Sequence, residues 1–248
     1  MSFVNKVAVV TGGSSGMGAA TVRALSHAGA KVSFIDVDKS GALKIAEETG
    51  SKMLVGDVSD SFFCEKAISK VVEEEGRIDI LVNAAGIIFR SNGLNTDDES
   101  WRKIMSVNID GLFFMCRAVL KQMVLQKSGN IINFGSIWGD VAGPGVAAYC
   151  ASKGAVHQIT RSLALEHVED GIRINAVAPG EVNTPMLSSG RRSIPTEHEL
   201  QKLADETIPM KRLAEPEEIA EVVMFLASEK SSYMTGSIVP VDAGYTAR

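Results

Sequence analysis

The sequence predicts an α/β fold in which a doubly wound parallel sheet of about seven strands carries helices on both faces. Short runs rich in β-branched residues alternate with segments of helical period almost to the end of the chain. Such alternation is typical of parallel sheets with right-handed crossovers. The runs are also mostly apolar and do not alternate with polar residues, which is expected of strands that are buried on both faces.

The individual elements follow from these two patterns. The predicted strands are Lys6–Thr11, Lys31–Asp36, Lys52–Asp57, Ile78–Asn83, Asn130–Gly135, Ile172–Val177 and Gly236–Val241. The predicted helices are Gly16–His27, Gly41–Glu48, Ser61–Glu75, Glu99–Gln126, Ala147–Val168 and Pro216–Ala227. The 248 residues contain no linker or break in composition, so we expect a single domain over residues 1–248.

Residues 181–212 depart from the alternation. They contain three prolines, the run SSGRR at 188–192 and a polar patch at Thr196–Glu199. A long, weakly structured insertion in a compact domain is usually functional. We therefore expect one or two short helices that close over a substrate as a lid.

Composition and charge exclude several classes of protein. A net charge of −5 argues against a nucleic-acid partner, since phosphate binding favours a basic face. Three cysteines without a C-x-x-C pair suggest neither a metal site nor a disulfide framework. The chain begins without the pattern of a signal peptide, and no apolar run is long enough to span a membrane. We expect a cytoplasmic protein that has no membrane partner.

A glycine-rich turn, TGGSSGMG at residues 11–18, follows the first predicted strand and opens the first helix. Glycines let backbone N–H groups approach a pyrophosphate, which the N-terminus of a helix also attracts. The spacing of Gly12, Gly16 and Gly18 differs from the usual dinucleotide fingerprint G-x-G-x-x-G, so the turn alone is weak evidence.

An acidic residue strengthens the nucleotide interpretation. The second predicted strand ends in Asp36, where a carboxylate would accept hydrogen bonds from the ribose of an adenosine. It would also repel the additional phosphate of NADP, and Asp38 adds a second negative charge. Lys39 is the nearest cation and the one feature that argues the other way. The sequence therefore predicts NAD as the cofactor.

Further motifs follow in order along the chain. They are Asp57, Asn83-Ala84-Ala85-Gly86, Asn108, Ser136, Tyr149-x3-Lys153, and Pro179-Gly180 followed by Thr184. Over essentially the whole chain this pattern resembles the short-chain dehydrogenase/reductase family. The resemblance implies a Rossmann-like, dinucleotide-binding catalytic domain and an NAD(H)-dependent oxidoreductase that interconverts a secondary alcohol and a ketone.

The expected catalytic residues are Ser136, Tyr149, Lys153 and Asn108. Hydride leaves an alcohol carbon only as the hydroxyl proton departs, so a base is needed at the oxygen. Lys153 lies four positions after Tyr149 on the same helix face, and its charge favours the tyrosinate. Ser136 ends the fifth predicted strand and would donate to the carbonyl oxygen. The resemblance adds that Lys153 binds the nicotinamide ribose and that Asn108 holds a water in a proton relay.

The resemblance also implies contacts with the cofactor. Asp57 is expected near the adenine, and residues 83–86 are expected around the adenosine, where they also brace the sheet. The family more often has a second asparagine where this chain has Ala84, which weakens any local hydrogen-bond claim. The expected cofactor-binding residues are Gly12, Ser15, Gly16, Met17, Gly18, Asp36, Asp57, Val58, Asn83, Ala84, Gly86, Tyr149, Lys153, Pro179, Gly180, Val182 and Thr184.

The substrate is the least determined feature. Trp138 is either a wall of the substrate pocket or a packed anchor. The other residues expected to line the pocket are Val141, Phe89, Arg90 and the lid residues from Met186 to Ile194. Arg191 and Arg192 in the lid could bind a carboxylate or sulfonate bidentately, or could simply be solvated. They lead to the hypothesis that the substrate is a small hydroxy-acid or hydroxy-sulfonate.

Two other functions stay open at this point. One is an NADP-dependent 3-oxoacyl carrier-protein reductase, which Asp36 argues against. The other is a non-catalytic NAD-binding protein, because fold alone does not guarantee activity. Such a protein would be expected to lose Ser136, Tyr149 or Lys153, and this chain retains all three. The resemblance further implies a homotetramer built through the predicted helices 99–126 and 147–168.

Overall fold

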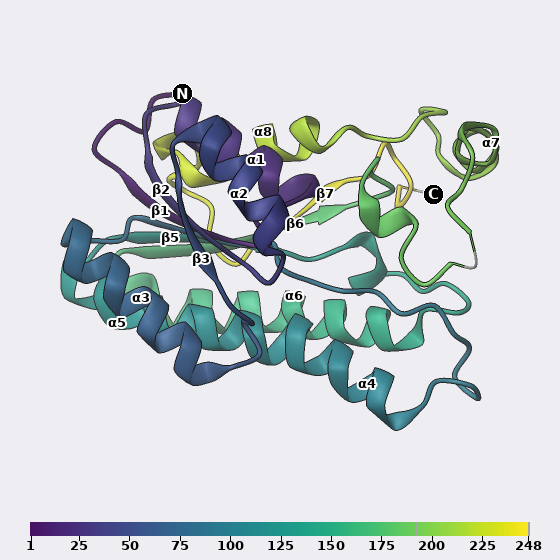
Figure 1. The fold of residues 1–248 in the computed structure, drawn as a ribbon, viewed down its shortest axis with the longest axis horizontal. Helices are drawn as coiled ribbons and strands as arrows, with labels where there is room; N and C mark the ends of the chain where they lie inside the picture. Colours follow the sequence, from purple (N-terminus) through teal and green to yellow (C-terminus); the bar gives the residue numbers. More distant parts are fainter. Residues whose placement is uncertain (192, 248) are drawn as a thin grey trace.

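The computed structural model describes residues 1–191 and 193–247, and its central feature is a seven-stranded sheet (Figure 1). The strands are β1 (Val7–Thr11), β2 (Lys31–Asp36), β3 (Lys52–Val55), β4 (Ile80–Asn83), β5 (Gly129–Phe134), β6 (Ile172–Pro179) and β7 (Ile238–Val241). Their order is β3-β2-β1-β4-β5-β6-β7, and every neighbouring pair is parallel. The doubly wound sheet predicted from the sequence is thereby confirmed.

Helices cover both faces of this sheet. They are α1 (Gly16–His27), α2 (Lys39–Thr49), α3 (Ser61–Glu75), α4 (Asp98–Met105), α5 (Leu112–Gln126), α6 (Ala147–His167), α7 (Glu197–Thr207) and α8 (Pro216–Ala227). Figure 1 shows α1, α2 and α8 on one face and α3, α5 and α6 on the other. In the same view, α7 stands apart from the sheet at the end of the molecule where the C-terminus lies.

The core is divided by the sheet into two apolar clusters. In β1, Val7 and Val9 pack into the cluster formed with α3, α5 and α6. Ala8 and Val10 point the other way, into the cluster formed with α1 and α8. Because successive strand residues point to opposite faces and both faces are covered, the whole strand must be apolar.

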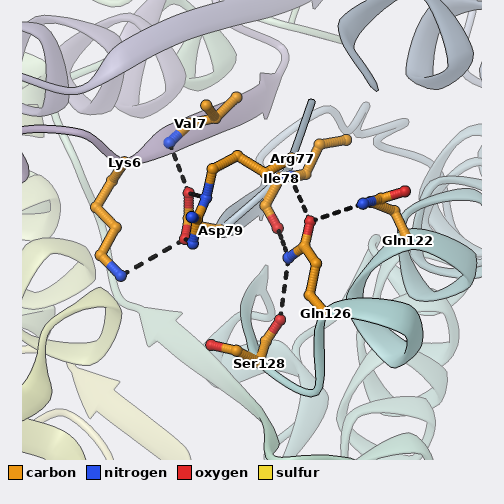
Figure 2. Close-up of polar contacts among 8 residues, drawn as sticks. All are labelled: Lys6, Val7, Arg77, Ile78, Asp79, Gln122, Gln126 and Ser128. Carbon is orange, nitrogen blue, oxygen red and sulfur yellow. Dashed lines mark hydrogen bonds and ion pairs between the residues drawn. The ribbon is translucent and has the colours of Figure 1, made fainter. Parts of the chain in front are cut away.

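Hydrogen bonds and ion pairs of side chains stabilise the edge of the sheet at which the strands begin (Figure 2). Asp79 accepts a hydrogen bond from the backbone N–H of Val7 at 2.9 Å and pairs with Arg77 at 2.6 Å. Burial alone would raise the pKa of Asp79, but Arg77 and the N–H of Val7 hold it below its usual value. Gln126 of α5 accepts from the N–H of Ile78 at 2.9 Å and donates to its carbonyl at 2.8 Å. These contacts fix where β4 starts.

The helix predicted over residues 99–126 is interrupted. A π-helical turn, Ser106–Gly111, separates α4 from α5. Within this turn the side chain of Asn108 accepts a hydrogen bond from the backbone N–H of Ile87 and donates one to its carbonyl. The wider turn therefore occurs where the helix makes tertiary contacts with the loop after β4. The local sequence is helical throughout, which is why periodicity alone predicts one continuous helix.

Several other boundaries differ from the prediction by one or two residues. The third strand ends at Val55 instead of Asp57. Gly56 lies so close to Phe63 that a Cβ there would meet Cδ2 of the ring at 2.6 Å, and the chain turns away at this contact. The predicted lid contains a short 3-10 helix, Pro185–Leu187, together with α7, as expected. Within the described part of the chain, no helix combines the length and apolar character that crossing a membrane requires.

Candidate active site

Two cavities lie at the edge of the sheet where the strands end. The first, which we call the nucleotide cavity, runs beside the turn after β1, from Asp36 to Thr184. The second, the catalytic cavity, contains Ser136 and Tyr149. Met17, Thr184 and Met186 line both cavities. A crevice at this edge, where the strand order reverses between β1 and β4, is where ligands bind in open parallel sheets.

The predicted glycine-rich turn forms one wall of the nucleotide cavity. The φ angle of Gly12 is +68°, and a Cβ there would meet the backbone of Ala85 at 2.8 Å. The first turn of α1 has no acidic residue, and Ser15 at its N-cap makes no capping bond with its side chain. The free N–H groups and the positive helix end therefore fit an anionic group such as a pyrophosphate.

The acidic end of the nucleotide cavity contains both predicted carboxylates. Asp36 accepts from the backbone N–H groups of Ser14 at 3.0 Å and Asp38 at 2.9 Å, so it fixes the glycine-rich turn to β2. Asp57 pairs with Lys103 of α4 at 3.2 Å. Burial would raise the pKa of Asp57, but Ser59 and Lys103 hold it below its usual value. Sequence reasoning missed Lys103, because nothing local marks it as a partner of Asp57.

Most predicted cofactor residues line one of the two cavities. In the nucleotide cavity they are Gly12, Ser15, Gly16, Met17, Gly18, Asp36, Asp57, Val58, Ala84, Gly86 and Thr184. In the catalytic cavity they are Tyr149, Pro179, Gly180, Val182 and Thr184. Asn83 and Lys153 line neither cavity. The side chain of Asn83 is buried and bonds to Asn133 at 2.9 Å and to the Cys116 sulfur at 3.2 Å. Asn83 therefore braces β4 against β5 and α5.

Ser136 and Tyr149 are brought together in the catalytic cavity, as predicted. The Ser136 hydroxyl accepts from the N–H of Trp138 at 3.2 Å, which leaves its own proton free to donate. Burial raises the pKa of Tyr149 to about 12, although its hydrogen bond with Ser136 acts in the opposite direction. Without a bound ligand, the Tyr149 hydroxyl is therefore protonated at neutral pH.

Lys153 and Asn108 lie behind this pair. The Lys153 ammonium donates to the carbonyl of Phe134 at 2.7 Å and lies 5.6 Å from the centre of the Tyr149 ring. Burial lowers the pKa of Lys153 to about 8. The Asn108 side chain donates to Ile87 and to Ser152, both at 3.0 Å, and accepts from Ile87 at 2.8 Å. These bonds hold the loop after β4 against α6.

A buried histidine that sequence reasoning did not single out supports Ser136. Nε2 of His157 accepts from the backbone N–H of Ser136 at 3.5 Å, and Nδ1 lies 3.1 Å from the Asp140 carboxylate. A Cβ at Gly139 would meet Cε1 of the ring at 2.5 Å, and one at Gly135 would come closer still to Nε2, so glycines on both sides of Ser136 make room for the ring. Burial holds the pKa of His157 below its usual value, against the pull of Asp140.

Known proteins are similar to this chain over nearly its whole length. A family model described as enoyl-(acyl carrier protein) reductase matches residues 12–246. The chain is 42% identical to a meso-2,3-butanediol dehydrogenase of Serratia marcescens over 250 residues, covering 100% of this chain and 97% of the relative. It is also 42% identical to a galactitol 2-dehydrogenase (L-tagatose-forming) of Cereibacter sphaeroides, with coverages of 96% and 94%. The chain belongs to the short-chain dehydrogenase/reductase family.

A solved structure and a further relative bear on the fold and on the alternative function. The crystal structure of gox2181 superimposes with a TM-score of 0.93 at 40% identity, covering 100% of this chain and 98% of that one. A 3-oxoacyl-[acyl-carrier-protein] reductase of Thermotoga maritima is 36% identical over 249 residues, with coverages of 98% and 99%. As a short-chain dehydrogenase/reductase, the chain is an oxidoreductase that uses a nicotinamide cofactor.

The substrate side of this short-chain dehydrogenase/reductase has walls from several segments. Trp138 lines the catalytic cavity and also packs edge-on against Tyr245 at 5.9 Å, so it is both a pocket wall and a packed anchor. Arg90, Met186 and Leu187 line the same cavity, as expected, whereas the predicted Phe89 and Val141 do not. Glu181 also lines this cavity, and only its position directly after Pro179-Gly180 could have pointed to it.

Arg191 of the lid does not line the catalytic cavity. Arg191 donates from Nε to the carbonyl of Leu187 at 2.7 Å and lines a separate depression beside α7, with Pro195 and Glu199. Arg192 lies outside the described residues. That these arginines bind an anionic substrate group stays a prediction.

Proposed function

We propose that the protein is an NAD(H)-dependent oxidoreductase that interconverts a secondary alcohol and a ketone, with Tyr149 as the acid/base. The observation that carries this proposal is the junction of the two cavities at Met17, Thr184 and Met186. A nicotinamide at that junction would face the hydroxyl groups of Ser136 and Tyr149. The names of the butanediol and galactitol relatives support an alcohol as the substrate.

In the direction of ketone reduction, Ser136 donates a hydrogen bond to the carbonyl oxygen and stabilises the charge that develops there. Tyr149 donates its proton to the same oxygen. The raised pKa of Tyr149 supports this step, since its hydroxyl holds a proton at neutral pH. The cofactor, when bound, supplies or accepts the hydride.

In the direction of alcohol oxidation, the same hydroxyl must give up its proton before it can act as a base. The pKa of Lys153, about 8, keeps the ammonium charged at neutral pH, and a positive charge 5.6 Å from the Tyr149 ring favours the tyrosinate. We propose that Lys153 also binds the nicotinamide ribose and passes protons on through a water near Asn108. The π-helical turn that contains Asn108 supports this relay, because such turns are frequent at functional sites.

The choice of NAD rests on Asp36. Its carboxylate lines the nucleotide cavity, where it would bind ribose hydroxyls and repel an additional phosphate. Lys39 begins α2 and is not among the residues that line the cavity. The carrier-protein reductase alternative has support from the Thermotoga relative, and Asp36 argues against its NADP dependence.

The first test is an absorbance assay of nicotinamide reduction with a panel of secondary alcohols, run with NAD and with NADP. Turnover with NAD at higher kcat/KM than with NADP would support the proposal. Turnover only with NADP would show that Asp36 does not set the cofactor. Turnover of an acyl carrier-protein substrate alone would favour the alternative.

We also propose that the protein forms a homotetramer through α5 and α6. Of the apolar side chains on these helices, Leu112 and Leu163 are buried in the core, whereas Phe113 is 38% exposed. Phe113 is therefore one side chain available for a subunit contact. Sedimentation at micromolar concentration tests this, and a monomer would contradict it.

A further inference from the structure

Two opposite charges enter the catalytic cavity from segments far apart in the chain. Arg90 lies in the loop after β4, and Glu181 follows β6. Both line the cavity that contains Ser136 and Tyr149. The proposed hydride transfer assigns no role to either charge.

Neither charged group has a full set of hydrogen-bond partners in the described part of the chain. No hydrogen bond or ion pair reaches the Glu181 carboxylate from any residue in the ranges 1–191 and 193–247. Arg90 donates from Nε to the carbonyl of Ser189 at 3.2 Å, and its two terminal nitrogens bond to none of the described residues. Burial raises the pKa of Glu181 and lowers that of Arg90, so both groups have lost water. The two charges attract each other, and Arg191 also attracts Glu181, but this attraction does not replace the hydrogen bonds that each group lacks. Partly buried charges without a full set of hydrogen bonds are costly, which points to a ligand that completes them.

The position of the two groups places this ligand contact beside the reacting oxygen. Glu181 raises the pKa of Tyr149, whereas Arg90 lowers it. Both charges are therefore close enough to act on the Tyr149 hydroxyl. Arg90 is also held by the lid through its bond to Ser189, and Gly190 lies so close that a Cβ there would meet the backbone nitrogen of Arg90 at 3.1 Å. A substrate group bound here would lie near the carbon that takes or gives the hydride.

The chemistry of the pair selects a hydroxyl group. An ionised carboxylate only accepts hydrogen bonds, and a guanidinium only donates them. One hydroxyl can donate to Glu181 and accept from Arg90 at the same time. A substrate carboxylate or sulfonate could bond to Arg90 but would be repelled by Glu181. A plain alkyl group would leave both charges unsatisfied.

We infer that Glu181 and Arg90 bind a second hydroxyl of the substrate, next to the reacting one, and that the substrate is a neutral vicinal diol or polyol. This inference rests on the proposed alcohol–ketone activity. It makes Glu181 and Arg90 residues that determine specificity, while Ser136 and Tyr149 act on the first hydroxyl.

Three alcohols that differ in one substituent test the inference: isopropanol, propylene glycol and lactate. Each has the same secondary alcohol, flanked by a methyl, a hydroxymethyl or a carboxylate group. We expect the wild-type protein to oxidise propylene glycol with the highest kcat/KM. In Glu181→Ala that value should fall about 10- to 100-fold, as expected for a lost hydrogen bond to a charged group, with little change for isopropanol. Activity toward lactate should rise.

Matched variants separate binding from a general disturbance. Glu181→Gln keeps an acceptor oxygen and should recover part of the preference for propylene glycol. Glu206→Ala removes an exposed charge from α7 and should leave the preference unchanged. The NADH dissociation constant, measured by fluorescence, should be the same in Glu181→Ala and wild type. If it rises together with a uniform loss of activity, Glu181 is structural and the inference is wrong.

The outcomes also separate this inference from the proposed function. Equal kcat/KM for isopropanol and propylene glycol would overturn the role of Glu181 while the alcohol–ketone activity stands. A preference for lactate would do the same and would favour the lid arginines as an anion site. No turnover of any of the three alcohols, with NAD or NADP, would overturn both.

Discussion

Adding a single methyl group to Gly18 should weaken the binding of the cofactor to the glycine-rich turn. Gly18 lies in the first turn of α1, directly against the start of the turn. A Cβ there would meet the carbonyl carbon of Gly12 at 2.8 Å and its oxygen closer still. Both atoms are backbone, so no side-chain rotation relieves the contact in Gly18→Ala.

The size of the effect follows from this geometry. Relief requires the turn and the helix to move apart by about 1 Å, and such overpacking costs about 1–3 kcal/mol. For a chain of this size that lowers Tm by about 2–10 °C. The movement also displaces the N–H groups that would bind the pyrophosphate. Since a hydrogen bond to a charged group contributes about 1.5–3 kcal/mol, NADH binding should weaken roughly 10- to 100-fold.

The assay is a fluorescence titration with NADH, accompanied by thermal unfolding. Gly13→Ala is the matched control, because it adds the same methyl group in the same turn. Its Cβ would meet the buried ring of Phe34 at 2.7 Å, and Gly13 does not line the nucleotide cavity. We expect Gly13→Ala to lose stability but to bind NADH nearly as well as wild type.

Two results would refute the reasoning. Wild-type affinity for NADH in Gly18→Ala would mean that the turn does not hold the cofactor. An equal loss of affinity in Gly13→Ala and Gly18→Ala would mean that binding depends on overall stability and not on the wall of the nucleotide cavity.

Three further predictions concern single side chains. Tyr149→Phe should lower kcat for ketone reduction about 100- to 10,000-fold while the NADH dissociation constant stays within about threefold, and parallel loss of binding would make Tyr149 structural. Asp36→Ala should lower the preference for NAD over NADP about 10-fold or more in kcat/KM, and an unchanged ratio would remove Asp36 from cofactor choice. Because burial holds the pKa of His157 below its unfolded value of about 6.5, the unfolded chain binds this proton first and stability falls as pH drops below about 6.5. His157→Gln should therefore lose less Tm than wild type between about pH 7 and pH 5, and an equal loss would contradict the buried neutral histidine.

Much of the fold could be predicted from the sequence because its signals are local. The apolar run of β1 reflects burial on both faces of the sheet, and each residue of the strand carries this signal separately. The helix start at Gly16 and the end of α3 at Glu75, before Gly76, are likewise marked by residues beside them. Where a contact with another element accompanies the boundary, prediction failed: β3 ends at Val55, and the next residue, Gly56, lies against the ring of Phe63 in α3.

Part of the site could be predicted for the same reason. Tyr149 and Lys153 are four residues apart on one helix, so their common face follows from helical period alone. Asn83 shows the limit of this reasoning. A motif places it near the cofactor, but the side chain turns inward to Asn133 and Cys116, which come from other elements.

The sequence by itself determined the order of the strands and helices along the chain and the position of the glycine-rich turn, since these features depend on neighbouring residues. It also led to Ser136 and Tyr149 as residues at the edge of the sheet where ligands bind. Only the tertiary structure placed Glu181 and Arg90 in one cavity and His157 beneath Ser136. These groups come from segments that meet through packing alone. Burial, which shifts the pKa values of all three groups, exists only once the chain has folded.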